Sequence, residues 1–320
     1  KFLDRNGGFE MLLSFVIACY KSENTIENVV EEIENIVKQK DGCAYEIVLV
    51  NDASPDGVIK KLTLLADRNS NVKVIDLAKN VGKANAILAG LANIKGDLVV
   101  FMDDDGQCPV DQLWELVDAV ENGYDLAYAA YPHKKQSFIK NFGSKVNTRV
   151  SSWLLEQPRE IISSNFSVRR RFVCDEMIKY SGPFSNLRVL TLQSTQNIAM
   201  IPMEERERQY GKTGYTFIKL VRLMLNGCIS FSIKPLRMAF LSGMIFILAG
   251  IAGGIFGLVK MLHSVPGYEL LITIGIIGII GGILMIQQGL LGEYLGRINV
   301  TVNNRPQYVV RKKINIDEQK

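Results

Sequence analysis

Short apolar runs and amphipathic stretches alternate along the chain between residues 12 and 130. The apolar runs have the length and composition of buried strands, and they cover residues 12–18, 45–50, 72–75, 98–102 and 125–130. Between them, apolar residues recur with a period near 3.6 and predict helices that end near residues 37, 67, 92 and 120. This alternation indicates an α/β fold with a doubly wound, mostly parallel sheet.

Two later segments have the pattern of amphipathic helices. In residues 138–154, apolar side chains recur at helical spacing while lysine and arginine occupy other faces. Such a helix either lies on a membrane surface or covers the sheet. Residues 215–233 repeat the pattern and are followed by Pro235, which ends the predicted helix.

Residues 238–259 and 270–291 contain no charged side chain. Each segment is long enough to cross a hydrocarbon core of about 30 Å at about 1.5 Å per residue. Their many glycines suit close packing between membrane helices. We therefore predict two transmembrane helices, with a buried hairpin of a soluble protein as the alternative.

The distribution of basic residues predicts the orientation of this pair. The connector, residues 263–269, has no lysine or arginine. Basic residues flank the two spans instead: Lys234 and Arg237 before the first, and Arg297, Arg305, Arg311, Lys312 and Lys313 after the second. The positive-inside rule then predicts an inner (cytoplasmic) membrane protein with the α/β half and both termini in the cytosol.

Composition adds three expectations. A net charge of +4 gives no reason to expect nucleic acid as a partner. The five cysteines lack any CxxC spacing, which favours reduced thiols over a disulfide framework or a zinc site. Residues 1–10 fit no period, so we expect them to be an expression remnant and Met11 to be the natural start.

Three consecutive carboxylates, Asp103, Asp104 and Asp105, follow the predicted strand 98–102. The carboxyl ends of strands are where open α/β sheets bind ligands. Adjacent carboxylates repel each other, and a hard divalent cation that also binds substrate phosphates relieves that repulsion. The alternative is an acidic turn that caps the helix beginning near Asp111.

Other polar residues are expected at the same edge of the sheet. Asp52 and Gly82 follow the second and third predicted strands, so they can meet Asp103 around one nucleotide. The basic run at residues 169–171 either reaches a phosphate or begins a solvated helix, and we expect two of its three arginines to be solvated.

Two motifs give the chain a family resemblance. The run DDDGQCP at residues 103–109 resembles the DADLQxP motif of family 2 glycosyltransferases with the GT-A fold. The run GEYLGRI at residues 292–298, followed by RPQY at residues 305–308, is typical of bacterial polyprenyl-phosphate glycosyltransferases with two C-terminal spans. The resemblance covers the chain from Met11 to Val310. It includes the bactoprenol glucosyltransferases, the undecaprenyl-phosphate aminoarabinose-type transferases and dolichol-phosphate mannose synthase.

The resemblance implies roles for individual residues. Those implied to bind the nucleotide are Asp52, Asn80, Gly82, Lys83, Asp103 and Asp104. Those implied to hold Mg²⁺ or Mn²⁺ with the diphosphate are Asp103, Asp105 and Gln107. Asp105 is also expected to act in catalysis, with Arg208 and Lys212 as candidates for the acceptor phosphate.

The sequence departs from the family pattern at three places. The family's PxYNE is ACYKSE at residues 18–23, the arginine of SxFRL is replaced by Ser167, and SKY is Thr213-Gly214-Tyr215. These changes leave the donor sugar and part of the phosphate contacts open.

The resemblance implies inverting transfer of one sugar from a nucleotide-diphosphate sugar, with a UDP-sugar preferred, to undecaprenyl (polyprenyl) phosphate. The acceptor phosphate is already an anion, so a strong general base is not required. Two alternatives stay open: a glycosyltransferase with a hydroxyl acceptor, and a non-catalytic membrane adaptor that binds nucleotide sugar. The family also implies a homo-oligomer, a tetramer by resemblance.

The expected organisation has four parts after the remnant. Residues 11–213 form a cytosolic GT-A catalytic domain, and residues 214–235 form an interfacial amphipathic helix. A two-helix transmembrane hairpin spans residues 236–296, and residues 297–320 form a cytosolic tail.

Overall fold

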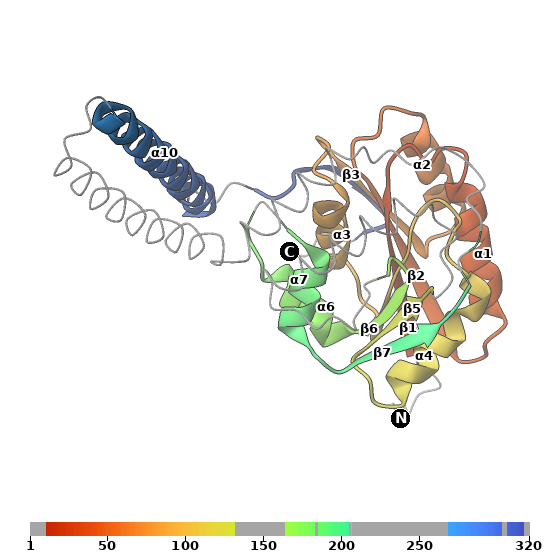
Figure 1. The fold of residues 1–320 in the computed structure, drawn as a ribbon. Coiled ribbons are helices and arrows are strands. Elements are labelled where there is room, and N and C mark those ends of the chain that lie inside the picture. The colour runs from red at the N-terminus through yellow and green to blue at the C-terminus, as the bar shows by residue number, and fades with distance from the viewer. Residues whose placement is uncertain are drawn as a thin grey trace.

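An eight-stranded sheet forms the centre of the protein. The structure is a computed structural model that describes residues 11–131, 164–182, 185–204, 206, 268–302 and 306–316. Within these residues the strand order is β7-β5-β6-β4-β1-β2-β3-β8, with helices on both faces of the sheet (Figure 1). The predicted doubly wound α/β architecture is confirmed.

Four parallel strands form the middle of the sheet. They are β1 (Met11–Cys19), β2 (Cys43–Asn51), β3 (Val72–Leu77) and β4 (Leu98–Phe101), and β1 pairs with both β2 and β4. All four were predicted from their apolar runs. Because they are parallel, their carboxyl ends lie at one edge of the sheet, where the polar residues of the sequence motifs follow them.

The outer strands complete the sheet. β5 (Leu126–Ala130) pairs in parallel with β7 (Ile198–Pro202), and β8 (Val310–Ile314) pairs antiparallel with β3. Between β4 and β5 lies β6 (Ser167–Arg170), which is antiparallel to both.

The beginning of the basic run at residues 169–171 forms part of a strand, not a helix start. Ser167 and Arg169 are 0% and 2% exposed on one face of β6, and the Arg169 guanidinium lies 3.9 Å from the centre of the Phe101 ring. Burial against aromatic rings lets a charged residue occupy a central strand, which hydropathy alone disfavours. Arg170 and Arg171 are half-buried.

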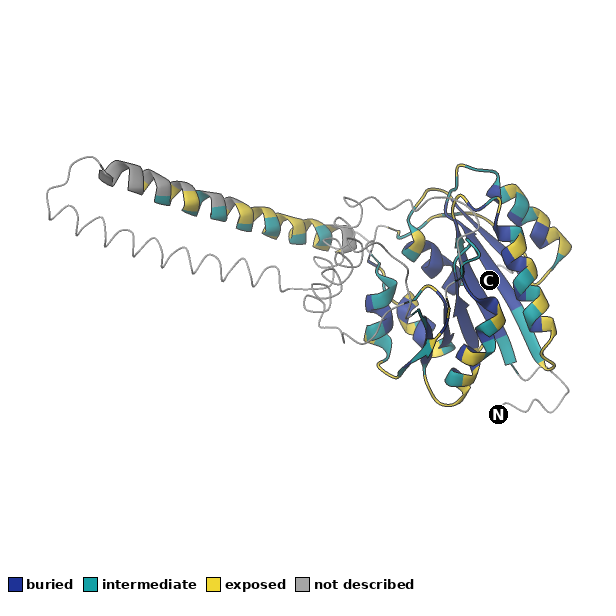
Figure 2. Ribbon diagram, turned by 45° about the vertical axis from the view of Figure 1, so that its right-hand side comes forward, coloured by how far each residue is buried: buried dark blue, intermediate teal, exposed yellow. Residues whose placement is uncertain are grey.

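Helices cover both faces of the sheet (Figure 2), and their apolar side chains form a separate buried cluster with each face. One face carries α1 (Ile26–Lys38), α2 (Val58–Arg68), η1 (Val110–Gln112) and α4 (Leu113–Glu121). The other carries α3 (Lys83–Leu91), α6 (Arg171–Ile178) and α7 (Leu187–Ser194). Alternate residues of β1 contribute to the two clusters, because strand side chains alternate between faces. The four cysteines within the described residues are free thiols.

The helix α10 (Tyr268–Val302) is 35 residues long and contains the second predicted span, residues 270–291. It extends away from the α/β body in both views (Figures 1 and 2). In the described part of the chain, no helix combines the length and the apolar character needed to cross a membrane. The first predicted span and the predicted amphipathic helices at 138–154 and 215–233 lie outside the described residues.

A buried ion pair stabilises the edge of the sheet opposite the motif residues. The Glu46 carboxylate, on β2, accepts hydrogen bonds from Lys73 Nζ, Ser14 Oγ and the backbone N–H of Lys95. Burial opposes ionisation of Glu46, but these three donors hold its pKa below its ordinary value of 4.5. The carboxylate therefore stabilises the fold above about pH 4.5, and this contribution is lost as the pH falls through the lowered pKa.

We predict that Glu46→Gln lowers the free energy of unfolding by about 3 kcal/mol at pH 7, because it leaves the Lys73 ammonium buried without its carboxylate. Chemical unfolding of the detergent-purified protein measures this loss, and the difference from wild type should shrink below about pH 4.5. Glu27→Gln is the matched control. It removes a carboxylate whose side chain is 40% exposed and pairs with Arg68, so its cost should stay under about 1 kcal/mol. Equal losses in the two variants would contradict the prediction.

Candidate active site

Asp52 joins the two turns that follow β2 and β3. Its carboxylate accepts hydrogen bonds from the backbone N–H of Val81 at 2.7 Å and of Gly82 at 3.0 Å. The side-chain amide of Asn80 donates to the Asp52 carbonyl at 3.0 Å. Asp52, Asn80 and Gly82, which the family resemblance implied to bind the nucleotide, are therefore in direct contact.

The backbone of Gly82 makes this arrangement possible. Its φ of 83° lies in the left-handed region, which a residue with a side chain rarely adopts, and Gly82 is also the N-cap of α3. Asp52 is 3% exposed, and burial raises the pKa of its carboxyl while the two backbone donors lower it by less. The carboxylate thus fixes the start of α3 relative to the end of β2.

Lys83, the first residue of α3, places its ammonium against the Asp103 carboxylate. The other oxygen of Asp103 accepts a hydrogen bond from Asn165 Nδ2 at 2.7 Å. Burial disfavours the charged form of Lys83, but the charge of Asp103 and the hydrogen bond to it hold the lysine pKa above its usual range. The turn after β3 and the loop after β4 thus form one polar site.

Asp104 is directed away from its two neighbours. Its carboxylate accepts a hydrogen bond from the backbone N–H of Tyr20 at 3.0 Å, and its carbonyl accepts one from Thr25 Oγ1 at 2.6 Å. Burial raises the pKa of this carboxyl to about 6. In this structure Asp104 therefore connects the loop after β4 to the turn between β1 and α1.

The loop of residues 103–107, here named the Asp-rich loop, ends in contact with the segment after β7. The backbone N–H of Arg206 donates to the Gln107 carbonyl at 3.2 Å, and Gln107 Nε2 donates to the Arg206 carbonyl at 3.4 Å. Arg206 Nη1 in turn donates to both carboxylate oxygens of Glu32, each at 3.0 Å, and its Nη2 contacts Asp111. These contacts fix the far end of the Asp-rich loop against α1.

The residues expected to hold a metal ion have side-chain oxygens of the type that binds a hard divalent cation. Asp103, Asp105 and Gln107 carry carboxylate and amide oxygens, which are the ligands that Mg²⁺ and Mn²⁺ prefer. Among the residues that the structure describes, no three His, Cys, Asp or Glu side chains form a metal-binding group. Two carboxylates and one amide leave ligand positions open, so a cation bound here would take its remaining ligands from water or phosphate.

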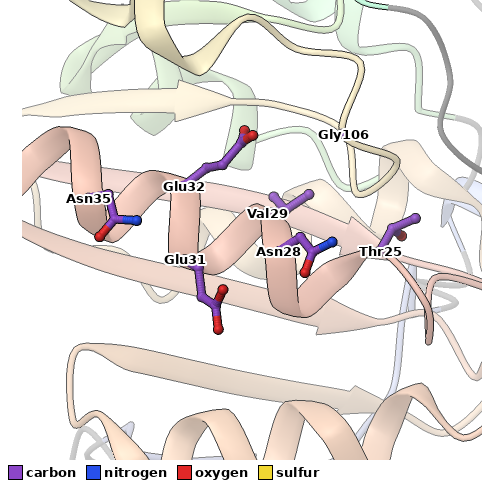
Figure 3. Close-up of a pocket in the computed structure, with 7 residues that line it drawn as sticks. All are labelled: Thr25, Asn28, Val29, Glu31, Glu32, Asn35 and Gly106. Atoms are coloured by element: carbon purple, nitrogen blue, oxygen red, sulfur yellow. The ribbon is translucent and has the colours of Figure 1, made fainter.

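A pocket of about 230 Å³ lies beside the Asp-rich loop, on α1 (Figure 3). Its lining residues are Thr25, Asn28, Val29, Glu31, Glu32, Asn35 and Gly106. Figure 3 shows the Glu32 side chain directed from α1 towards the side of the loop at Gly106. None of these lining residues belongs to the polar site formed by Asp52, Lys83 and Asp103, so the pocket is distinct from that site.

The sequence predicted most of the polar groups in this site but not all of them. Asn165 and Arg206 were missed, because an asparagine before a strand and an arginine in a charged loop have no distinguishing pattern in one sequence. Arg208 and Lys212, the predicted acceptor residues, lie outside the described residues.

The fold and the site together define a class. A parallel sheet whose carboxyl edge carries a buried aspartate, a helix start with lysine and a loop of three aspartates is an arrangement suited to an α/β protein that binds a phosphate-containing ligand at this edge. Comparisons with known proteins then identify the family.

A family model described as glycosyl transferase family 2 matches residues 14–178. The CsbB protein of Bacillus subtilis (strain 168) is 31% identical over 310 residues, which cover 94% of this chain and 92% of that protein. Undecaprenyl-phosphate 4-deoxy-4-formamido-L-arabinose transferase of Klebsiella pneumoniae (strain 342) is 27% identical over 304 residues, which cover 94% and 93%. The chain belongs to glycosyl transferase family 2, as the sequence motifs predicted.

One solved structure of similar fold is glucosyl-3-phosphoglycerate synthase from Mycobacterium tuberculosis, in complex with Mn²⁺, uridine diphosphate and phosphoglyceric acid. The TM-score is 0.50 at 19% identity, and the match covers 68% of this chain and 79% of that chain. This likeness supports the GT-A fold of the α/β domain.

A close contact between two turns of the site gives a prediction. The Glu23 carboxylate accepts a hydrogen bond from the backbone N–H of Gly57 at 3.0 Å, and a Cβ atom on Gly57 would lie 2.4 Å from Glu23 Oε1. We expect Gly57→Ala to displace the Glu23 carboxylate and to cost about 1 kcal/mol of stability through the lost hydrogen bond, measured by thermal unfolding. Because the clash involves Glu23 alone, adding Gly57→Ala to a Glu23→Ala protein should cost nothing further. A full additional loss in the double variant would contradict this explanation.

Proposed function

We propose that this family 2 glycosyltransferase transfers one sugar from a nucleotide-diphosphate sugar, preferentially a UDP-sugar, to undecaprenyl phosphate. The observation on which the proposal chiefly rests is the convergence of Asp52, Lys83 and Asp103 at the carboxyl edge of the sheet. The similarity to an undecaprenyl-phosphate transferase along 94% of the chain supports the choice of acceptor.

The reaction is a single in-line displacement with inversion. An oxygen of the acceptor phosphate forms a bond to the anomeric carbon while the bond from that carbon to the β-phosphate oxygen breaks, and nucleoside diphosphate leaves. A phosphate is already anionic at neutral pH, so the enzyme needs no strong general base. Its main tasks are to hold two anions close together and to compensate their charge.

Different residues are proposed to bind the nucleoside, the diphosphate and the acceptor phosphate. Asp52 and the turn around Gly82 hold the nucleoside part, and the Lys83 ammonium compensates charge on the diphosphate. Asp103, Asp105 and Gln107 would hold Mg²⁺ or Mn²⁺, which supplies further charge compensation on the leaving group when bound. Arg208 and Lys212 are proposed to contact the acceptor phosphate.

The acceptor lipid is confined to a bilayer, so we also propose an inner-membrane location. Residues 238–259 and 270–291 would form two spans, with the catalytic domain and both termini in the cytosol. Addition of cysteine-reactive reagents to closed vesicles tests this orientation. A cysteine introduced at Ser264 in the connector should react only from the side opposite the catalytic domain.

The transfer reaction provides the main test. Detergent-purified protein is incubated with undecaprenyl phosphate, Mg²⁺ or Mn²⁺, and radiolabelled UDP-, GDP- and dTDP-sugars in turn. We expect organic-extractable label from one donor class, and we expect EDTA or Asp105→Ala to remove at least about 99% of it, the loss typical of one missing transition-state group. Folded protein that binds a donor but labels no lipid would contradict the polyprenyl-phosphate acceptor. It would favour a hydroxyl acceptor or a binding function instead.

Asp52→Asn tests the donor side separately. An amide replaces one acceptor oxygen by an N–H donor, which faces the backbone N–H of Val81 or Gly82 without a partner. We expect the KM for the donor to rise about tenfold, the equivalent of roughly 1.4 kcal/mol, while the KM for the lipid stays unchanged. Asp67→Asn, at an exposed position of α2, is the control and should change neither constant.

A further inference from the structure

The strand β8 brings the end of the chain to the donor side of the sheet. It pairs antiparallel with β3, and the register joins Asp76 to Lys312 and Leu77 to Val310. Beyond β3 the contact continues, since the backbone N–H of Ala78 donates to the Val309 carbonyl at 2.8 Å. The segment that follows α10 therefore lies along the end of β3, next to the turn that contains Gly82.

Arg311, on β8, contacts the end of β3 and the residue after it through both Nη atoms of its guanidinium. Nη1 donates to Asp76 Oδ2 at 3.1 Å, and Nη2 donates to the carbonyl of Ala78 at 3.1 Å. The Arg311 side chain is 59% exposed, whereas that of Asp76 is 10% exposed. The arginine thus reaches from the surface to a buried carboxylate.

Asp76 transmits this contact to the turn after β2. Its Oδ1 accepts a hydrogen bond from Asn51 Nδ2 at 2.7 Å, and Asn51 is 2% exposed. Asn51 Oδ1 in turn accepts a hydrogen bond from the backbone N–H of Ser54 at 3.1 Å. These bonds fix the turn of residues 51–54, in which Asp52 immediately follows Asn51.

The second contact of Arg311, with the Ala78 carbonyl, lies next to the turn after β3 that binds Asp52. Ala78 precedes Asn80 by two residues, and Asn80, Val81 and Gly82 all donate hydrogen bonds to Asp52. One guanidinium therefore contacts the segment after β3 directly, through Ala78, and is linked to the turn after β2 through Asp76 and Asn51.

We propose that Arg311 is a positioning residue for the donor nucleotide, and that β8 thereby makes donor binding depend on the segment that follows α10. The inference rests on the proposed function, in which Asp52 holds the nucleoside part of the donor. Arg311 acts through Asp76 and Ala78 and does not itself contact the nucleotide. Without the guanidinium, Asp76 loses its cationic partner and the Ala78 carbonyl loses a hydrogen-bond donor.

Nucleotide binding to the full-length, detergent-purified protein tests the proposal. Isothermal titration with UDP and Mg²⁺ should give a Kd about fivefold higher for Arg311→Ala than for wild type, because part of each exposed hydrogen bond is replaced by water. Lys312→Ala is the matched control, since it removes a positive charge from an exposed side chain on the same strand. Its Kd should equal that of wild type.

Two more variants separate positioning from general stability. Arg311→Lys can keep the contact with Asp76 but not the one with Ala78, so its Kd should be intermediate, and it also serves if Arg311→Ala fails to fold. Asp76→Asn should also weaken UDP binding, and the two changes together should cost less than the sum of the two single effects, as for residues of one network.

The outcomes distinguish this proposal from the one on which it rests. If wild type binds UDP and Arg311→Ala binds it equally well, Arg311 has no positioning role, even if the variant unfolds at a lower temperature. Additive effects of Arg311→Ala and Asp76→Asn would likewise overturn the proposed path through Asp76. If wild type binds none of UDP, GDP and dTDP, the proposed donor site itself is wrong.

Discussion

The hydrogen bonds from Val81 and Gly82 to the Asp52 carboxylate determine the geometry of the donor side. They use backbone donors, so they fix the course of the chain and not only one side chain. They require the left-handed conformation of Gly82, and that residue is the N-cap of α3. Lys83 then points its ammonium at Asp103 because it is the next residue of the helix. A single buried carboxylate thus sets the relative positions of the segments after β2, β3 and β4.

The three carboxylates of the Asp-rich loop have different hydrogen-bond partners, which keeps their charges apart. Three adjacent carboxylates would repel one another strongly if they shared one environment. Asp103 instead faces Lys83 and Asn165, Asp104 faces the turn between β1 and α1, and Asp105 accepts a bond from the backbone N–H of Gln107. The loop therefore combines a structural carboxylate with two that remain near the edge where a cation and a diphosphate are expected.

The C-terminal strand β8 belongs to the same sheet as the N-terminal strand β1. The Gln107 and Arg206 contacts hold the Asp-rich loop on one side, and β8 with Arg311 holds the turns around Asp52 on the other. Gln307 strengthens the second arrangement, since its side chain donates to the carbonyls of Tyr180 and Gly182, each at 2.7 Å. A segment that comes after the long helix α10 thus joins the sheet to α6 and to the donor side. This connection gives Gln307, the third residue of the RPQY motif, a physical role in the fold.

The sequence by itself determined the four central strands, their helices and the polar residues that follow them. It did so because buried parallel strands are continuous apolar runs, and because Asp52, Gly82 and Asp103 come directly after such runs. It did not predict β6, since Arg169 is charged, and its burial depends on Phe101 and Tyr128 from other strands. Nor did it pair β8 with β3, or Arg311 with Asp76, because these partners are far apart in the chain and no local pattern marks them. Only the tertiary structure decided which distant groups compensate each buried charge, since that depends on distance in space and not on order along the chain.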